Sequence, residues 1–168
     1  LAASFSRATV NSPDGNVAAN HDAGNWTAYA GSNLSNHYSP GAQITPANVK
    51  DLKIAWEFHT GDLKPAGSKL GYAFQNTPLK VGDLVYICTP TQKVIAVEAT
   101  TGKERWRFDP KTNPKAMAGV AATTCRGVSY FEATTPVAEC AKRIFWPMVD
   151  GRLGALDAAT GKLCQSFG

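Results

Sequence analysis

The chain has 168 residues, of which 43% are hydrophobic and 18% are charged. That composition can bury a core and excludes an intrinsically disordered chain. The 17 Lys and Arg residues give a net charge of +4 but are scattered, so we expect no nucleic-acid partner. No stretch of about 18 apolar residues occurs, so no membrane span is predicted within this sequence.

The N-terminal part of the chain predicts little regular structure. Residues 1–24 are rich in Ala, Ser, Asn, Asp and Gly and show no hydrophobic period, so we expect an extended lead-in. Further along, Thr45 is a suitable N-cap and Pro46 a suitable first residue for a short helix ending near Asp51. This helix would lead into an extended segment, Leu52–His59.

One stretch of the sequence occurs twice and predicts a repeat architecture. VIAVEATTGKERWRF spans Val94–Phe108, and LGALDAATGKLCQSF spans Leu153–Phe167, 59 residues later (Gly161 minus Gly102). In each copy an alternating apolar run is followed by a glycine turn and a second short run. Because glycine readily takes the positive φ of a tight turn, each copy predicts a β-hairpin.

The similarity between the copies extends upstream and adds two candidate strands to each hairpin. Leu84–Cys88 aligns with Arg143–Pro147, and a fourth candidate strand precedes each set, at Phe74–Leu79 and at Arg126–Phe131. Four antiparallel strands in each repeat of roughly fifty residues is the pattern of a β-propeller blade.

The expected fold is therefore all-β: a partial β-propeller within residues 25–168, with blade 1 at about 74–109 and blade 2 at about 124–168. Leu52–His59 carries Trp and Phe at the same spacing as the end of the first copy. We interpret it as an outer strand that closes a blade whose other strands come from elsewhere in a longer protein.

Two blades cannot form a ring, because propellers typically use four to eight. We therefore expect the chain to be a fragment of a longer protein, able to self-associate through exposed sheet edges. The alternative is a complete small β-sandwich, since the length of the chain fits one ordinary domain.

The cysteines predict no metal site, because they lack the spacing of metal ligands. Their even number allows two disulfides, in three possible connectivities, as in an oxidising compartment such as the periplasm. Buried free thiols are the alternative. The four residues are Cys88, Cys125, Cys140 and Cys164.

Several short motifs, taken together, carry a resemblance to a known family. They are Asn25-Trp26 with Tyr29, Tyr38-Ser-Pro40, Ile44-Thr-Pro46, Ala55-Trp56, Thr60-Gly-Asp62, Thr77-Pro-Leu-Lys-Val-Gly-Asp83, Cys88-Thr89, Gly102-Lys103, Trp106, Asp109-Pro110, Thr124-Cys-Arg-Gly-Val-Ser-Tyr130 and Gly161-Lys-Leu-Cys164. The chain resembles the membrane-bound quinoprotein dehydrogenases, bacterial enzymes that use pyrroloquinoline quinone (PQQ) to oxidise glucose, quinate or shikimate, and other polyols. The resemblance runs from about Asn25 to Gly168 and is most specific between Thr124 and Tyr130.

The resemblance implies an eight-bladed propeller on the periplasmic face of the inner membrane, joined to a membrane anchor outside this sequence. It implies PQQ-dependent oxidation of a small polyol, with electrons passed to ubiquinone. It also implies a Ca²⁺ or Mg²⁺ ion that polarises a quinone carbonyl and an Asp that takes the hydroxyl proton. The residues for those two roles belong to later blades of the family, so this chain is assigned no catalytic or metal-binding residue and is expected to be inactive by itself.

Three positions correspond to cofactor-binding positions of the family. Arg126 matches an arginine that contacts PQQ, and its planar guanidinium can bind a carboxylate through two hydrogen bonds. Gln75 falls where relatives place an acidic residue near the cofactor, and Thr124 is a candidate because it lies beside Arg126. Without the family match, a salt bridge between blades is the preferred interpretation of Arg126.

The sequence departs from the family pattern at a position that concerns the substrate. Glucose-oxidising relatives have a His three residues before the motif Cys, where this chain has Ala122. Relatives also often carry Arg where this chain has His37 and His59. The missing His favours quinate, shikimate or another polyol over glucose. The three histidines, the third being His21, lack the spacing of a metal site.

A cofactor-free function is the alternative for the same repeats. Turns of the Ala-Thr-Gly-Lys type also occur in propellers that act as protein-binding scaffolds, such as the outer-membrane assembly lipoproteins. The block Thr124–Tyr130 and the segment from Asn25 to Pro40 distinguish the two, because the scaffold proteins have neither. The Trp residues are interpreted as blade-packing core.

Overall fold

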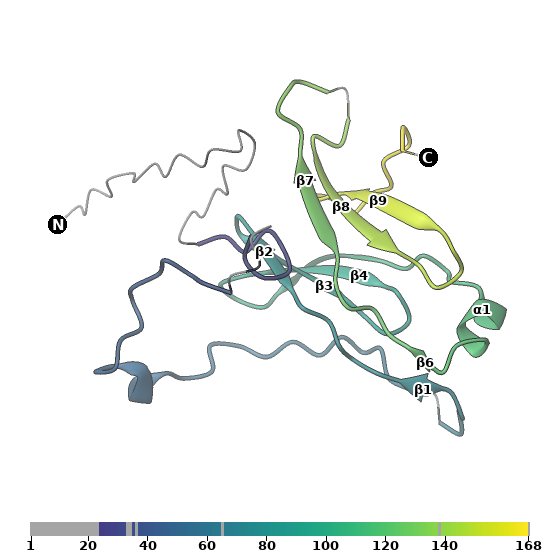
Figure 1. Ribbon diagram of the computed structural model, residues 1–168, viewed down its shortest axis with the longest axis horizontal. Helices are drawn as coiled ribbons and strands as arrows, with labels where there is room; N and C mark the ends of the chain where they lie inside the picture. The colour runs from purple at the N-terminus through teal and green to yellow at the C-terminus, as the bar shows by residue number, and fades with distance from the viewer. Residues whose placement is uncertain (1–23, 33–34, 36, 65, 138, 168) are drawn as a thin grey trace.

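The fold of the chain is seen in a computed structural model that describes residues 24–32, 35, 37–64, 66–137 and 139–167 (Figure 1). The predicted lead-in, residues 1–24, lies outside the described residues except for Gly24. The elements in chain order are a 3-10 helix η1 (Val49–Asp51), β1 (Gly71–Tyr72), β2 (Leu79–Val81), β3 (Leu84–Cys88), β4 (Val94–Glu98), β5 (Glu104–Phe108), α1 (Pro114–Ala118), β6 (Ala122–Thr123), β7 (Ser129–Glu132), β8 (Lys142–Pro147) and β9 (Leu153–Asp157). No helix among them is long and apolar enough to span a membrane.

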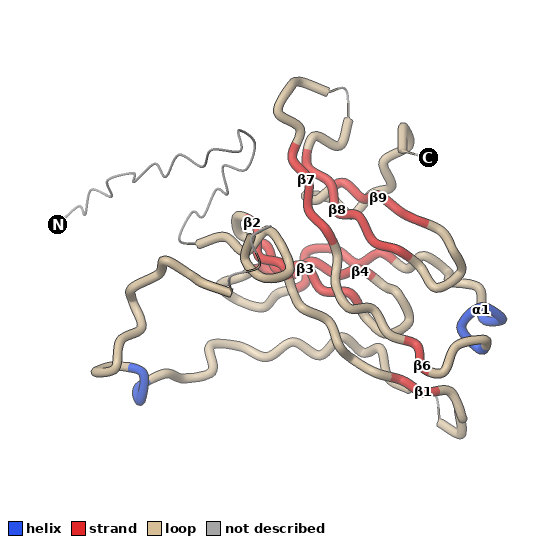
Figure 2. The backbone as a smooth tube through the Cα atoms, in the orientation of Figure 1, coloured by secondary structure: helices blue, strands red, loops and turns tan. Residues whose placement is uncertain are grey.

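The first repeat forms a four-stranded antiparallel sheet in the order β2-β3-β4-β5 (Figure 2). The predicted hairpin at its C-terminal end is confirmed: β4 pairs with β5, and Gly102 in the turn has a φ of 69°. Strand β4 is buried on both faces from Val94 to Val97, as expected for a strand between two packed layers.

The second repeat forms a three-stranded antiparallel sheet in the order β7-β8-β9. A single bridge between Leu156 and Leu163 stands where the first repeat has its fourth strand. The expectation of a full fourth strand in this repeat is therefore corrected. The bridge is formed by the Cys164 N–H, which donates to the Ala155 carbonyl (3.0 Å), and it goes no further because the chain turns there, with the Phe167 N–H donating to the Cys164 carbonyl (3.1 Å).

The first strand of each sheet begins later than the sequence predicted. The expected strands at Phe74–Leu79 and Arg126–Phe131 start at Leu79 and at Ser129. The residues before each strand pair with each other instead, because β1 and β6 form a parallel two-stranded sheet that links the two repeats.

One prediction of a helix is also corrected, and one helix was not predicted. Thr45 does not cap a helix: its carbonyl accepts hydrogen bonds from Asn48 and Val49 in a turn, and the 3-10 helix starts only at Val49. The sequence also contains a helix that was not predicted, α1, whose N-cap Asn113 accepts a hydrogen bond from the Lys115 backbone N–H (2.9 Å). Pro114 occupies its first position, which is the usual place for proline in a helix.

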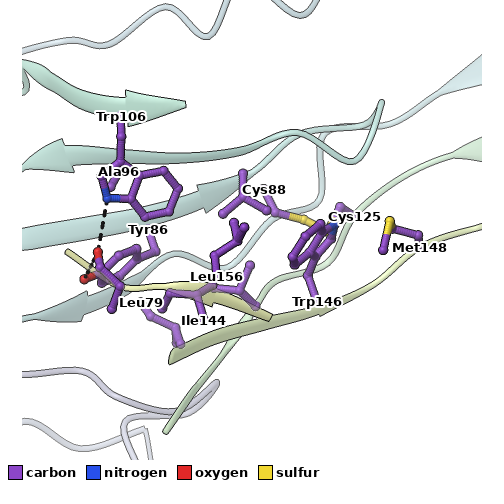
Figure 3. Close-up of a cluster of buried hydrophobic side chains, with 13 residues drawn as sticks. Leu79, Tyr86, Cys88, Ala96, Trp106, Cys125, Ile144, Trp146, Met148 and Leu156 are labelled. Carbon is purple, nitrogen blue, oxygen red and sulfur yellow. Dashed lines mark hydrogen bonds between the residues drawn. A yellow bond between two sulfur atoms is a disulfide. The ribbon is translucent and has the colours of Figure 1, made fainter. Parts of the chain in front are cut away.

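The two large sheets share one hydrophobic core (Figure 3). Leu79, Tyr86 and Trp106 of the first sheet are buried together with Ile144, Trp146 and Leu156 of the second. The ring of Phe108 meets that of Trp146 edge-on, with centroids 5.5 Å apart. Aromatic residues on facing sheets therefore supply much of the area that stabilises the packing.

A tryptophan on one layer docks onto the glycine turn of the next, and this contact occurs twice. The Trp106 indole N–H donates to the Ala158 carbonyl (3.1 Å), and its ring lies against Gly161. In the same way the Trp56 indole donates to the Ala99 carbonyl (3.0 Å) and lies against Gly102.

The docking of Trp56 places Leu52–His59 over the outer face of the first sheet, where Trp56 and Phe58 pack against Ile87, Ile95 and Val97. The segment forms no strand with any other described residue. That its strand partners lie elsewhere in a longer protein stays a prediction. In the second copy the position of Trp106 is taken by the exposed Gln165, four residues after the glycine as in the first copy.

All four cysteines form disulfides, Cys88–Cys125 and Cys140–Cys164. The first joins the end of β3 to the segment after β6, and the second joins the loop before β8 to the segment after β9. The structure thus selects one of the three connectivities that the sequence allowed and excludes buried free thiols.

A buried carboxylate organises the loop between β3 and β4. Asp62 accepts hydrogen bonds from the Thr91 backbone N–H (3.0 Å) and hydroxyl, and its ion pair with Lys93 Nζ is 2.9 Å long. Burial alone would raise the pKa of Asp62, but hydrogen bonds from Thr89, Lys93 and Thr91 outweigh it and lower the pKa to about 2. The backbone of Asp62 also contacts β1, since the Tyr72 hydroxyl donates to the Asp62 backbone carbonyl (2.7 Å).

Replacing Gly161 by Ala is expected to destabilise the protein by more than about 2 kcal/mol, because a positive φ and overpacking each add about 1 kcal/mol or more. A Cβ at Gly161 would lie 2.5 Å from the Trp106 indole, and its φ is 70°. The measurement is urea unfolding followed by tryptophan fluorescence.

The matched control for this substitution is Gly82→Ala, because Gly82 also has a positive φ (57°) but a Cβ there meets nothing within 4 Å. We expect it to lose only about 1 kcal/mol, the contribution of the backbone alone. Equal losses in the two variants would show that the tryptophan docking does not stabilise the fold.

Asp62→Asn is expected to lower stability by up to about 2 kcal/mol at pH 6, the free energy that corresponds to the lowered pKa. Since that pKa falls from 3.8 to about 2 on folding, the contribution is present above about pH 4 and disappears as the pH approaches 2. Urea unfolding of both proteins from pH 6 to pH 2.5 measures the difference. A gap that stays constant over this range would contradict the assignment, and the exposed Asp83, as Asp83→Asn, is the control.

Candidate functional site

The candidate cofactor-binding residues come together where the first sheet is linked to the second. Strands β1 and β6 pair in parallel, with Gly71 opposite Ala122, and the chain segments that follow stay side by side (Figure 1). The Ala73 N–H donates to the Thr123 carbonyl (3.1 Å), and the Thr77 N–H donates to the Arg126 carbonyl (2.9 Å). Gln75 lies between those two hydrogen bonds, so it flanks the Thr124–Arg126 segment.

The side chains of this region present both exposed and shielded polar groups. Gln75 and Arg126 are exposed, so an amide and a guanidinium are accessible to a ligand. Thr124 is half-buried, and its hydroxyl has no hydrogen-bond partner among the described residues. The side-chain NH₂ of Asn76, the residue after Gln75, is also buried and also has no hydrogen-bond partner among the described residues. Buried polar groups without partners are uncommon in folded proteins, so each of these two groups is available to bind a polar ligand.

The Thr124–Arg126 segment is fastened to the first sheet by contacts from separate residues. Cys125 is disulfide-bonded to Cys88, and the Cys88 backbone N–H donates to the Asn76 side chain (3.1 Å). The Gln92 side chain donates to the Thr124 carbonyl (2.8 Å). The backbone that carries Arg126 is therefore held in a defined place even though the guanidinium itself is exposed.

Sequence reasoning missed Asn76, Gln92 and Asp62 as contributors to this region. Asn76 stands next to Gln75, so its position in the sequence was a usable signal. Asp62 belongs to the Thr60-Gly-Asp62 motif, but nothing in that motif indicates that its carboxylate reaches a loop 29 residues away. The left-handed conformation of Gln92 has no sequence signal, since glycine and asparagine are the residues that usually adopt it.

Two ionisable side chains of β7, the strand that follows Arg126 in the chain, are held in fixed protonation states. The Tyr130 hydroxyl donates to Glu132 (2.8 Å), and burial, followed by that hydrogen bond, raises the pKa of the phenol. The Glu132 carboxylate accepts that bond and pairs with Lys142, which lowers its pKa. Tyr130 therefore stays protonated and Glu132 ionised at neutral pH.

The histidines and other ligand types form no metal site in the part of the chain that is described. No group of three His, Cys, Asp or Glu side chains there could hold a metal ion. The ring of His37 instead meets Tyr29 edge-on, with centroids 5.9 Å apart. His21 lies outside the described residues.

Comparison with known proteins shows the family to which this chain belongs. The family model described as PQQ: glucose/ethanol/alcohol dehydrogenase, beta-propeller domain, matches residues 26–168. The quinoprotein glucose dehydrogenase A of Acinetobacter calcoaceticus is 44% identical over an alignment 156 residues long that covers 85% of this chain and 19% of that protein. The quinate/shikimate dehydrogenase (quinone) of Acinetobacter baylyi is 37% identical over an alignment 161 residues long that covers 86% of this chain and 19% of that protein.

Solved structures agree with the sequence relatives. A quinohemoprotein alcohol dehydrogenase from Pseudomonas putida HK5 matches with a TM-score of 0.71 and 27% identity, over 87% of this chain and 19% of that one. The chain thus spans about a fifth of the length of these relatives. The expected all-β, partial-propeller fold is confirmed, and the β-sandwich alternative is not supported. The chain belongs to the β-propeller domain family of the PQQ-dependent glucose, ethanol and alcohol dehydrogenases.

Proposed function

We propose that the full-length protein is a PQQ-dependent dehydrogenase of a polyol or cyclic alcohol, and that this chain supplies one part of its cofactor site. The observation that carries the proposal is the position of Gln75 beside Thr124–Arg126, in a chain of the PQQ propeller family. The segments are tied by backbone hydrogen bonds, so the backbones that carry the two exposed polar side chains run side by side.

The residues present fit PQQ as a ligand. PQQ is a quinone with three carboxylates, and the exposed guanidinium of Arg126 can bind a carboxylate through two parallel hydrogen bonds. The Gln75 amide can both donate and accept at the cofactor edge. The Thr124 hydroxyl and the Asn76 NH₂, both without partners among the described residues, are further groups that a polar ligand would satisfy.

PQQ, when bound, supplies the quinone that takes two electrons from the alcohol. The residues of this chain bind and orient. Arg126 places positive charge against the anionic cofactor, and the disulfide beside it keeps the peptide that carries it in place. Tyr130, held protonated by Glu132, is a hydrogen-bond donor and not a base. The catalytic Asp and the ligands of a Ca²⁺ or Mg²⁺ ion are proposed to lie in other blades of the full-length protein.

A polyol or cyclic alcohol is the proposed substrate class. The family resemblance places a His of the glucose-oxidising enzymes at the position of Ala122, which is half-buried in β6 opposite Gly71. A methyl group there cannot donate or accept a hydrogen bond. This difference favours quinate, shikimate or another polyol, although a glucose dehydrogenase is among the similar relatives.

The proposal extends to the location and the electron acceptor. Two disulfides within one short chain suit an oxidising compartment, which supports a periplasmic location. By resemblance to the membrane-bound quinoprotein dehydrogenases, we propose the periplasmic face of the inner membrane as the site of action and ubiquinone as the acceptor.

Arg126→Ala in the full-length protein is expected to raise the PQQ dissociation constant at least about tenfold, since a hydrogen bond to a charged group contributes about 1.5–3 kcal/mol. The measurement is titration of the apo protein with PQQ in the presence of Ca²⁺, followed by quinone absorbance and by dye reduction with quinate, shikimate and glucose. Arg105→Ala is the control, because Arg105 is exposed on β5 and pairs with Glu98 (3.0 Å) away from this segment.

Each outcome of this titration has a separate meaning. Binding of PQQ and reduction of dye by the unaltered protein, both weakened in the Arg126 variant alone, would support the dehydrogenase. If the unaltered protein bound no PQQ, the cofactor-free scaffold would be favoured instead.

A further inference from the structure

We propose that Gln92 is a positioning residue of the cofactor site: its buried side chain fixes the Thr124–Arg126 segment, and Asp62 locks Gln92 in place. The inference rests on the proposed function, since it concerns how the PQQ-binding arginine is oriented. Gln92 does not touch the surface that Arg126 and Gln75 present, because it is only 2% exposed.

The backbone of Gln92 adopts a conformation that its side chain does not favour. Its φ is +72°, in the left-handed region, which a residue with a Cβ occupies at an energy of about 1–2 kcal/mol. Glycine or asparagine would adopt this conformation more readily. A glutamine in a strained, buried position therefore points to a function of its side chain.

The side chain of Gln92 makes one contact that reaches across the sheets. Its Nε2 donates to the Thr124 carbonyl (2.8 Å), 32 residues further along the chain. That carbonyl belongs to the peptide between Thr124 and Cys125, so the bond fixes the plane of the peptide that immediately precedes the Cys125–Arg126 unit. Together with the backbone angles of Cys125, the rotation of this peptide orients the backbone from which the Arg126 side chain leaves.

Three consecutive residues of the segment are held, each by a different kind of bond. Thr124 is held by the Gln92 amide, Cys125 by its disulfide with Cys88, and Arg126 by the hydrogen bond from the Thr77 N–H to its carbonyl (2.9 Å). The disulfide and the Thr77 bond anchor the segment to the first sheet and its entry segment. Among the described residues, only the Gln92 bond is made to the carbonyl at its start.

Gln92 is itself fixed on both sides by Asp62. The carboxylate accepts from the Thr91 N–H (3.0 Å) and pairs with Lys93 Nζ (2.9 Å), so both neighbours of Gln92 are bound to one buried acid. The turn is closed by the Gln92 N–H, which donates to the Thr89 carbonyl (2.8 Å). The amide of Gln92 thus has little freedom to turn away from Thr124. Asp62 restrains the turn that holds Gln92, and Gln92 restrains the backbone that carries Arg126.

The closing experiment uses the full-length apo protein carrying Gln92→Gly. Glycine keeps the left-handed backbone without strain, but the variant lacks the buried side chain and its bond to Thr124, so it is expected to fold with a modestly lowered melting temperature. We expect its dissociation constant for PQQ to rise about tenfold, measured by quenching of tryptophan fluorescence during titration with PQQ and Ca²⁺. At saturating PQQ the KM for the alcohol is expected to stay unchanged.

Lys111→Gly is the matched control, because Lys111 is also a left-handed residue (φ 51°) but lies on an exposed loop, where it pairs with Asp109. Its PQQ affinity is expected to match that of the unaltered protein. Gln92→Glu is the second variant: it keeps the shape of the side chain but sets a carboxylate against the Thr124 carbonyl, and it too is expected to weaken PQQ binding about tenfold.

A rise of less than threefold in both Gln92 variants, with the unaltered protein binding PQQ, would overturn the positioning role and leave the proposed function standing. An equal rise in Lys111→Gly would overturn it as well, since the effect would then not be local. If the unaltered protein bound no PQQ at all, the proposed function would fall first and this inference with it.

Discussion

The contact between a tryptophan on one layer and a glycine turn on the next is the constraint on which the rest of this structure depends. Trp106 reaches from β5 to the turn after β9, and Trp56 reaches in the same way to the turn after β4. In each case an indole N–H is satisfied by a backbone carbonyl and the ring fills the space that a side chain on the glycine would occupy. This arrangement buries the apolar area of the indole and also gives its N–H a hydrogen-bond acceptor.

This docking fixes how the layers are stacked, and the stacking in turn forms the candidate site. Once the sheets are in register, the segments that enter them, after β1 and after β6, run side by side. Gln75 and Arg126 are neighbours for that reason, although they are distant in the sequence. A disulfide and a buried glutamine then hold the arginine-bearing backbone, while the guanidinium is left exposed.

The repeat made the fold predictable from the sequence, but only in part. The hairpins were identifiable because an alternating apolar run followed by a glycine turn is a local signal, and both glycines take the positive φ expected of them. The start of each sheet was misplaced, since the parallel pairing of β1 with β6 depends on partners about fifty residues apart that no local pattern reveals. The helix predicted at Thr45 was wrong because Asn48, not Thr45, begins the helical turn.

At the site, the family resemblance located Gln75, Thr124 and Arg126, and the structure brings them together. The residues that support them could not be predicted in the same way. Asp62 acts through a loop that only tertiary packing brings to it, and Gln92 sits in a backbone conformation that its own side chain disfavours. The sequence also did not determine how the four cysteines pair, because that depends on the distances between them in the fold.

The direction of the tryptophan docking has a consequence for how the protein is made. Each tryptophan is translated before the turn that receives it: Trp106 precedes Ala158 by 52 residues, and Trp56 precedes Ala99 by 43. At a synthesis rate of about 5–20 residues per second, the Ala158 carbonyl that accepts the Trp106 hydrogen bond is made roughly 3 to 10 seconds after Trp106. During that interval the face of the sheet that carries Trp106 has no partner to pack against. The packing of each layer therefore depends on the layer synthesised after it.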